Sequence, residues 1–252
     1  ACLSPCLADL EPDFAGTPQV ITIHNIGYQG DFPLHQMDDL GVEAARAIQC
    51  GLLLHGKINL LAGGIVHANA VTTVSAQYAQ EIQGELGYGL QGIIQARRDD
   101  LYGIMNGMDY DEWNPATDPH LAQNFDYNSP QVFADKAINK TALQKELGLP
   151  LDKDAIVAGL VTRLVDQKGI DALANPSHGA LRRLAKRPGL QLALLGSGEQ
   201  WCEYELAEIA EEFPNVAFFA GYNEALSHRI VAGSDLFLMP SRYEPCGLSQ
   251  LY

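Results

Sequence analysis

The sequence has little positive charge. Its 252 residues include 16 Lys and Arg against 31 Asp and Glu, so the formal net charge is -15 at pH 7. This excess of negative charge repels the phosphates of nucleic acids and the surfaces of anionic membranes. We therefore expect neither nucleic acid nor a membrane as a partner. An anionic ligand must instead be bound by a few local cations.

Cysteine is scarce and follows no recognisable pattern. The five cysteines are Cys2, Cys6, Cys50, Cys202 and Cys246. An odd number without a CxxC pair argues against a disulfide framework or a structural zinc site. A reducing compartment suits this cysteine usage. The histidines have no HExxH or HxxxH spacing, so we predict no catalytic metal site.

Long apolar runs and a signal peptide are also missing. A transmembrane helix needs about 18 or more consecutive apolar residues. With 47% hydrophobic residues, the chain can bury a sizeable core in one large or two small domains. The run Gly196-Ser197-Gly198-Glu199 lacks the third glycine of the dinucleotide fingerprint, which argues against a dehydrogenase.

What the sequence does contain is an alternation of strand and helix patterns. Strands are predicted over residues 20–23, 70–74, 101–105, 156–161, 190–195, 216–219 and 236–239. Helices are predicted over residues 44–48, after Ser75, from a cap at Ser129 to Gly148, and over residues 199–212 and 224–232. This order predicts an α/β protein with two doubly wound parallel sheets. We expect domains at residues 1–104 and 105–252, facing a cleft near Asn106.

Polar residues follow the predicted strands, and ligands bind at the carboxyl edge of such sheets. Arg163 and Lys168 lie five residues apart in a predicted loop before a helix, where two cations could clamp a diphosphate or simply form a solvated pair. The Gly196 to Glu199 turn could let a ligand approach the backbone or serve as a plain turn.

Three further side chains have two interpretations each. Tyr222, directly after Gly221, could stack on a base or pack under the next helix. Glu244, in a Pro-Cys-Gly loop, could recognise sugar hydroxyls or be a solvated acid. His24 follows a buried strand and could be a core histidine, although Asn25 and the glycines beyond it favour a site loop.

Several blocks in a fixed order give the chain a resemblance to a known family. They lie at residues 24–30, 71–75, 106–109, 113–115, 139–140, 143–144, 163–169 and 240–248. Together they resemble the bacterial glycogen synthases and plant starch synthases, which are retaining glucosyltransferases of family 5. The resemblance implies the GT-B architecture, in which two Rossmann-like, doubly wound parallel-sheet domains face a cleft, both incomplete here.

The resemblance also implies an activity and a role for each site residue. The family transfers glucose from ADP-glucose to the non-reducing end of an α-1,4-glucan, with retention and without a metal or cofactor. Arg163 and Lys168 would bind the diphosphate, and Gly221 and Tyr222 would lie against the adenine. His24, Asn25 and Asn106 would line the glucose pocket. The transferred sugar would be held by Glu244, Cys246 and Gly247.

The family's Lys-Thr-Gly-Gly loop and Thr-Gly-Gly loop do not occur in the sequence. We therefore predict that this chain alone is inactive. One alternative is a non-catalytic fragment that binds only nucleotide or glucan, and another is a GT-B enzyme with a different donor or acceptor. The family implies the bacterial cytoplasm or the plastid stroma as the location. Product, donor nucleotide and oligomeric state stay open.

Overall fold

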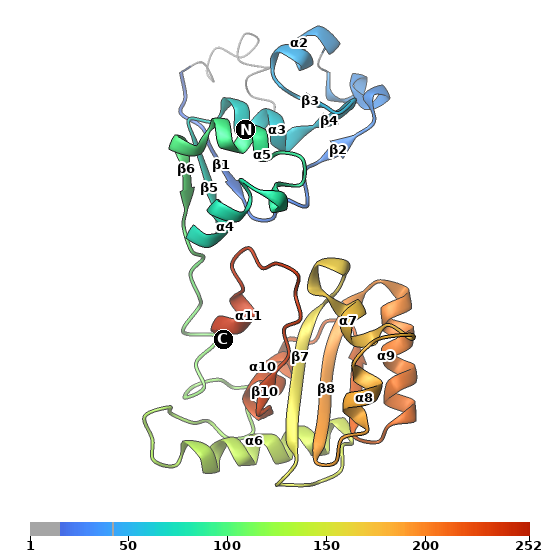
Figure 1. Cartoon of the computed structure of the whole chain (residues 1–252). Helices are drawn as coiled ribbons and strands as arrows, with labels where there is room; N and C mark the ends of the chain where they lie inside the picture. The colour runs from blue at the N-terminus through green and yellow to red at the C-terminus, as the bar shows by residue number, and fades with distance from the viewer. Residues whose placement is uncertain (1–15, 42) are drawn as a thin grey trace. The chain divides into compact units, whose positions relative to one another are not determined.

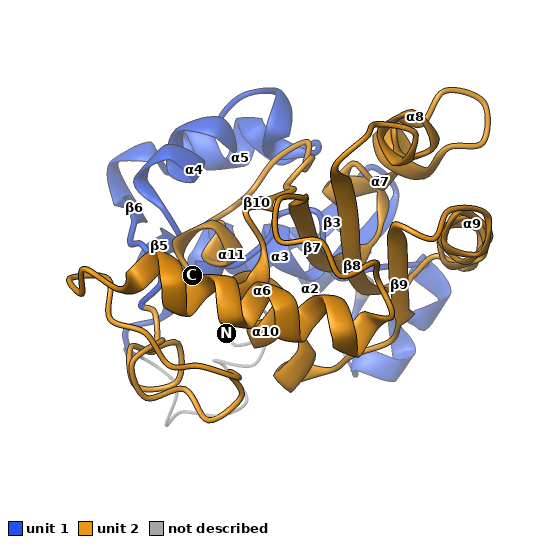
Figure 2. Ribbon diagram, turned by 90° about the horizontal axis from the view of Figure 1, so that it is seen from below, with its two compact units in different colours: residues 1–107 blue, residues 108–252 orange. Residues whose placement is uncertain are grey.

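The computed structural model describes residues 16–41 and 43–252. They form two compact units that divide after Gly107 (Figure 2). The sequence analysis places the boundary between residues 104 and 105. Each unit is described separately below. Cys2 and Cys6 lie outside the described residues. Within the described part, no helix is long and apolar enough to cross a membrane.

Unit 1 contains a parallel sheet of order β1-β5-β6, formed by β1 (Val20–Ile23), β5 (Ala70–Thr73) and β6 (Leu101–Gly103). These strands confirm the sequence prediction. Helices accompany them: α2 (Ala44–Gln49), α3 (Leu60–His67), α4 (Ala76–Glu81) and α5 (Gln91–Ala96). Short 3-10 turns are η2 (Leu34–Gln36), η3 (Asp38–Leu40), η4 (Glu85–Gly87) and η5 (Arg98–Asp100).

A small antiparallel sheet in unit 1 was not predicted. It has the order β2-β4-β3 and consists of β2 (Asp31–Phe32), β4 (Lys57–Asn59) and β3 (Leu53–Leu54). Ile58 of β4 and Leu52, just before β3, pack with Met37, Ala47 and Cys50 in a separate buried cluster. Strands of two or three residues are too short to produce a recognisable alternation, so the sequence pattern could not reveal them.

Unit 2 is built on a parallel sheet of order β10-β7-β8-β9 (Figure 1). The strands are β7 (Ile156–Leu164), β8 (Leu190–Gly198), β9 (Val216–Ala220) and β10 (Leu236–Phe237). The helices and turns are α6 (Val132–Leu147), η6 (Asp166–Lys168), α7 (Ile170–Ala174), α8 (Leu181–Ala185), α9 (Gln200–Glu212), α10 (Glu224–Gly233) and α11 (Leu248–Leu251).

Side-chain alternation along β7 and β8 builds two cores in unit 2. Leu160 and Leu194 belong to the core that packs against α7, α8 and α9, whereas Val157, Ala193 and Leu195 belong to the core that packs against α6 and α10. Figure 1 shows these two groups of helices on opposite faces of the sheet. Since successive side chains of a strand point to opposite faces, a strand buried on both sides reads as a continuous apolar run. The sheet is therefore the middle of three layers.

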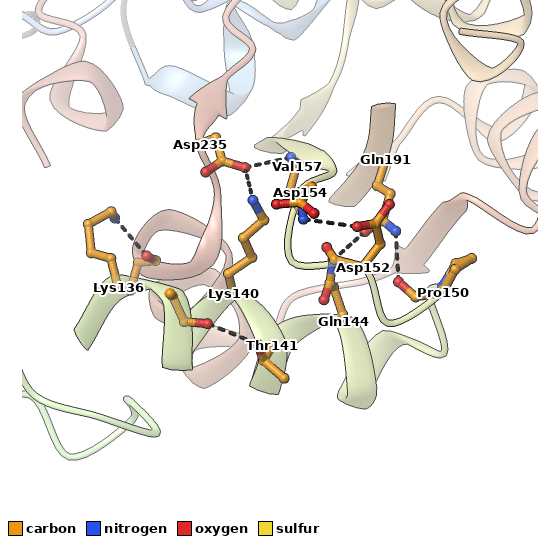
Figure 3. A network of polar contacts seen from close by, with 12 residues as sticks. Lys136, Lys140, Thr141, Gln144, Pro150, Asp152, Asp154, Val157, Gln191 and Asp235 are labelled. Carbon is orange, nitrogen blue, oxygen red and sulfur yellow. Dashed lines mark hydrogen bonds and ion pairs between the residues drawn. The ribbon is translucent and has the colours of Figure 1, made fainter. Parts of the chain in front are cut away.

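Polar contacts fix α6 against the sheet (Figure 3). Lys140 pairs with Asp235 at 2.8 Å, and the same carboxylate accepts a 2.8 Å hydrogen bond from the backbone of Val157. Gln144 donates a 2.9 Å bond to the side chain of the buried Gln191. These partners satisfy polar groups that would be costly to bury alone.

Two local expectations need correction. α6 begins at Val132 after an N-cap at Gln131, while Ser129 accepts a bond from the Gln131 amide in the preceding turn. β7 and β8 run beyond the predicted ends, so Arg163 lies in a strand and not in a loop. The helix after it, α7, has only five residues and ends before Asn175. The Asn175-Pro176-Ser177 run thus separates α7 from α8.

Candidate active site

A cavity of about 420 Å³ lies at the carboxyl edge of the unit 2 sheet. Adjacent strands supply its floor, with Arg163 from β7 and Ser197 from β8. The following loop adds Gly221 and Tyr222, and α10 adds Glu224. Because all these strands are parallel, their carboxyl ends meet at one edge. The structure thus brings three of the predicted site residues, Arg163, Gly221 and Tyr222, into one cavity.

The backbone positions these residues closely. Arg163 is directly opposite Ser197 in the β7–β8 register. Gly221 has a φ of 133°, which favours glycine, and its amide donates a 3.0 Å bond to the carbonyl of Gly196. This bond fixes the position of the loop that carries Tyr222. The tyrosine ring is 85% exposed, so packing beneath the next helix is not its role.

The glycines of β8 have a structural explanation. A Cβ on Gly196 would lie 2.2 Å from the Thr162 carbonyl oxygen, and one on Gly198 would lie 2.3 Å from that of Leu164. Both contacts are far closer than real Cβ atoms allow. The two glycines are therefore required by the close approach of β7, whatever ligand the cavity accepts.

Lys168 and Glu244 lie in a hollow beside this cavity. Lys168 Nζ is 2.7 Å from Glu244 Oε1, and both side chains are mostly buried. Ser241 Oγ donates to the same carboxylate oxygen at 2.5 Å. Val161 and Thr162 line both the hollow and the larger cavity. Arg163 and Lys168 thus occupy neighbouring spaces separated by the end of β7 and do not form a two-cation clamp in this structure.

A close backbone approach explains how Lys168 and Glu244 meet. Gly169 has a φ of 63°, and a Cβ there would lie 2.1 Å from the carbonyl oxygen of Pro240. The Arg242 amide donates a 2.9 Å bond to the carbonyl of Gln167. The turn after β7 and the loop after β10 are therefore held together through their backbones.

The remaining predicted residues of unit 2 follow β10. Cys246 is half-buried, and Gly247, with a φ of 77°, precedes α11. They belong to the same loop as Glu244. Burial raises the pKa of the other cysteine of this unit, Cys202, to about 12, so its thiol stays protonated and is no candidate nucleophile.

Unit 1 carries its predicted residues in a separate place. His24 and Asn25 line a cavity of about 250 Å³ together with Tyr28 and Leu61. Asn25 Oδ1 accepts a 3.0 Å bond from the Gly27 amide, which shapes the loop after β1. His24 is exposed and is therefore no core histidine. Asn106 is half-buried in the segment after β6.

The sequence analysis missed a cluster on the rim of the large cavity. Glu112, Glu224 and His228 each place one ligand-type atom within 4.8 Å of the others. A hydrogen bond with Glu224 raises the pKa of the Glu112 carboxyl. Since Glu112 and His228 are far apart in sequence, only the fold brings them together. No spacing rule could have detected the cluster.

Comparison with known proteins identifies the class. A family model described as "Starch synthase catalytic domain" matches residues 1–96. The catalytic domain of starch synthase IV from Arabidopsis thaliana, solved with ADP and acarbose, superposes with a TM-score of 0.84 at 36% identity, covering 99% of this chain and 51% of that one. The fold is therefore that of a GT-B glycosyltransferase.

The curated relatives narrow this class. The glycogen synthase of Treponema denticola is 44% identical over 241 residues, which is 95% of this chain and 48% of the relative. That of Aromatoleum aromaticum is 46% identical over 237 residues, covering 93% and 46% respectively. The chain is thus similar over almost its whole length to glycogen synthases and to a starch synthase. It spans about half the length of the curated relatives it matches.

Proposed function

We propose that this chain is part of a retaining glucosyltransferase that transfers glucose from ADP-glucose to the non-reducing end of an α-1,4-glucan, without a cofactor. The observation that carries the proposal is the convergence of Arg163, Gly221 and Tyr222 on one cavity at the carboxyl edge of the unit 2 sheet. This edge is where doubly wound folds bind nucleotides.

The cavity has the features that a nucleoside diphosphate requires. The exposed ring of Tyr222 offers a face on which adenine can stack. The guanidinium of Arg163 provides a planar donor for phosphate oxygens. In a chain with a net charge of -15, this cation is a local exception on the cavity wall. We assign residues 105–252 as the nucleotide-sugar side of the enzyme.

The hollow beside the cavity suits the reacting ends of the donor. Lys168 and Glu244 neutralise each other at 2.7 Å. A diphosphate that draws Lys168 away from this pair frees the Glu244 carboxylate to accept bonds from sugar hydroxyls. Lys168 then stabilises the negative charge that develops on the departing ADP. Cys246 and Gly247, in the loop of Glu244, would contact the sugar through their backbone.

Residues 1–104 would form the acceptor side. His24 and Asn25 line their own cavity, and we assign them, with Asn106, to the glucose and glucan. The location we propose is the bacterial cytoplasm or the plastid stroma, from the bacterial and plant relatives. The alternative is a fragment that binds nucleotide without transferring glucose.

A binding measurement tests the nucleotide assignment independently of transfer. Replacement of Arg163 with Ala should weaken ADP binding, measured by calorimetry, tenfold or more, because a charged hydrogen bond contributes about 1.5–3 kcal/mol. Arg183→Ala is the matched control, since Arg183 is exposed on α8 and does not line the cavity. Equal affinities for the two variants would refute the assignment of Arg163.

Transfer is measured as incorporation of glucose from ADP-glucose into glycogen. The assay compares this chain with a form extended at both ends to the length of its relatives. Transfer by the extended form alone supports the enzyme and the predicted inactivity of the isolated chain. ADP binding without transfer in either form would favour the non-catalytic alternative.

A further inference from the structure

The imidazole of His228 is held in a way that leaves one ring nitrogen available. Its Nδ1 lies 2.7 Å from Oδ2 of Asp118, and both side chains are almost fully buried. A carboxylate can only accept, so Nδ1 donates this bond, and in the neutral ring the lone pair is on Nε2. Within the described residues, Nε2 has no hydrogen-bond partner. A buried polar atom without a partner requires an explanation.

Two carboxylates lie beside this ring. One oxygen of Glu112, one of Glu224 and one ring nitrogen of His228 are all within 4.8 Å of one another. Because Asp118 occupies Nδ1, Nε2 is the ring nitrogen left to bind an ion. Glu112 and Glu224 line the large cavity, so the cluster is accessible from solvent. His228 lines the adjoining cavity of about 200 Å³.

We propose that Glu112, Glu224 and His228 bind a divalent metal ion of the zinc and cobalt class. Zinc binds both imidazole nitrogen and carboxylate oxygen, and imidazole nitrogen selects first-row transition metals over magnesium and calcium. The Asp118–His228 pair matches the arrangement in which a carboxylate orients a metal-ligating histidine and raises its basicity. The buried nitrogen excludes magnesium and calcium as the preferred ions, since both select oxygen ligands.

The geometry allows the cluster to close on an ion. Zinc ligands lie about 2.0–2.2 Å from the metal, so two of them are roughly 3.5 Å apart. Each pair of the three atoms must therefore approach by about 1.3 Å at most. Glu112 and Glu224 are exposed and can rotate to do so. Stacking of Trp113 on the His228 ring at 3.8 Å holds the nitrogen donor in place.

The ion would connect two parts of unit 2 that are distant in sequence. Glu112 lies in the segment before α6, whereas Glu224 and His228 lie on α10. The ion also brings positive charge to a pair of neighbouring carboxylates. Because an ion that binds only the folded state stabilises it, the expected consequence is resistance to unfolding. The site is not assigned to the transfer chemistry and stands without the proposed function.

The test uses Co²⁺ with the 252-residue chain and two double variants. E112Q/E224Q removes two ligand charges from exposed positions, so folding is retained. E208Q/E211Q removes the same two charges from exposed positions on α9 and is the matched control. Calorimetry measures the affinity, thermal unfolding measures the stabilisation, and visible absorption distinguishes nitrogen and oxygen ligands from cysteine thiolates.

We expect the wild type and E208Q/E211Q to bind one Co²⁺ by nitrogen and oxygen ligands and to melt at a higher temperature with the ion. E112Q/E224Q should bind at least tenfold more weakly and lose the rise in melting temperature. Equal binding by all three proteins, an equal loss in both double variants, or thiolate ligation of the ion would overturn the proposal.

Discussion

The parallel sheets of the two units are stabilised by different interactions. In unit 2, β7 and β8 each have nine residues, and apolar side chains alternate into two cores. In unit 1, β1 and β5 have four residues each, and polar side chains hold the helix ends. Long strands buried on both faces position the site of unit 2 by packing, whereas in unit 1 individual side-chain hydrogen bonds at the ends of α3 add to the packing of a buried apolar core.

Arg97 and Asn59 illustrate these hydrogen bonds. Arg97 donates to the carbonyls of Ile65, Val66 and Ala68, at 2.6, 2.9 and 2.6 Å, around the end of α3. Asn59, at the start of the same helix, accepts a 2.7 Å bond from the Ala62 amide. Both ends of α3 are thus satisfied by side chains, as the unpaired groups of a helix require.

Apolar packing should be the main contribution to the stability of unit 2. Leu194→Ala tests this and should have the largest effect on the free energy of unfolding. Leu194 is 1% exposed in the core beneath α9, and truncation of such a side chain costs about 2–5 kcal/mol of unfolding free energy. The measurement is chemical denaturation. Leu236→Ala, on the edge strand β10 where the side chain is 54% exposed, should cost much less. If both substitutions lower the free energy of unfolding by similar amounts, buried packing does not explain the stability of unit 2.

The hydrogen bonds of Arg97 should contribute strongly to the stability of unit 1. Arg97→Met tests this and should have the second largest effect on the free energy of unfolding. The substitution keeps most of the apolar stem but removes the donors to three carbonyls. Since a bond to a charged group contributes about 1.5–3 kcal/mol, we expect a loss of this order in the free energy of unfolding. The neighbouring Arg98 has a 72% exposed side chain, so Arg98→Met should change little. If Arg97→Met leaves the free energy of unfolding unchanged, side-chain hydrogen bonds do not stabilise unit 1 in the way proposed.

Asn59 tests the contribution of side-chain hydrogen bonds at the other end of α3. Its Nδ2 donates to Gln29 at 2.7 Å and to Asp31 at 2.8 Å, in addition to the cap. Asn59→Ala should cost about 0.5–2 kcal/mol for the lost cap. Asn59→Asp keeps an acceptor for the cap but places a like charge beside Asp31. If Asn59→Asp proves as stable as the wild type, only the cap matters.

The smallest effect concerns the contact between α7 and the loop after β10 in unit 2. Arg242 donates to both carboxylate oxygens of Asp171, at 2.8 and 2.9 Å, and lowers the pKa of Asp171 to about 2. Arg242→Gln should raise this pKa toward about 3.9, measured by NMR titration. An unchanged pKa would show that Arg242 is not the cause of the shift.

The sign of the accompanying stability change follows from the lowered pKa. The pair contributes fully above about pH 4, the unfolded value, and its contribution disappears as the pH falls to about 2. Wild type and Arg242→Gln should therefore converge in stability in acid. Because Arg242 is 45% exposed, the difference at neutral pH should not exceed about 1 kcal/mol.

The sequence predicted most where apolar alternation sets the structure. The strands of unit 2 and the edge at which Arg163 and Tyr222 lie follow from long buried runs with polar ends. Prediction failed where a single tertiary contact determines the local structure. The pairing of Lys168 with Glu244 depends on the approach of Gly169 to Pro240, and the β2-β4-β3 sheet depends on strands too short to show a period.

The sequence analysis also missed side chains that are distant in sequence and that only the fold brings together. Asp118, Glu112 and His228 gave no local signal, because a motif search reads neighbours in sequence. The predicted cap at Ser129 failed for a related reason. Its side chain can bond the Gln131 amide two residues later, and this turn delays the helix, as serine hydroxyls often do.

The lack of a side chain at position 169 has a mechanical consequence. The turn and the loop that meet there are pressed backbone to backbone, so neither can shift without displacing the other. A movement of either segment must therefore carry the backbones of both along, while the side chains of Lys168 and Glu244 stay free to separate. A residue with a side chain at this position would force the two segments apart and so change the spacing between Lys168 and Glu244.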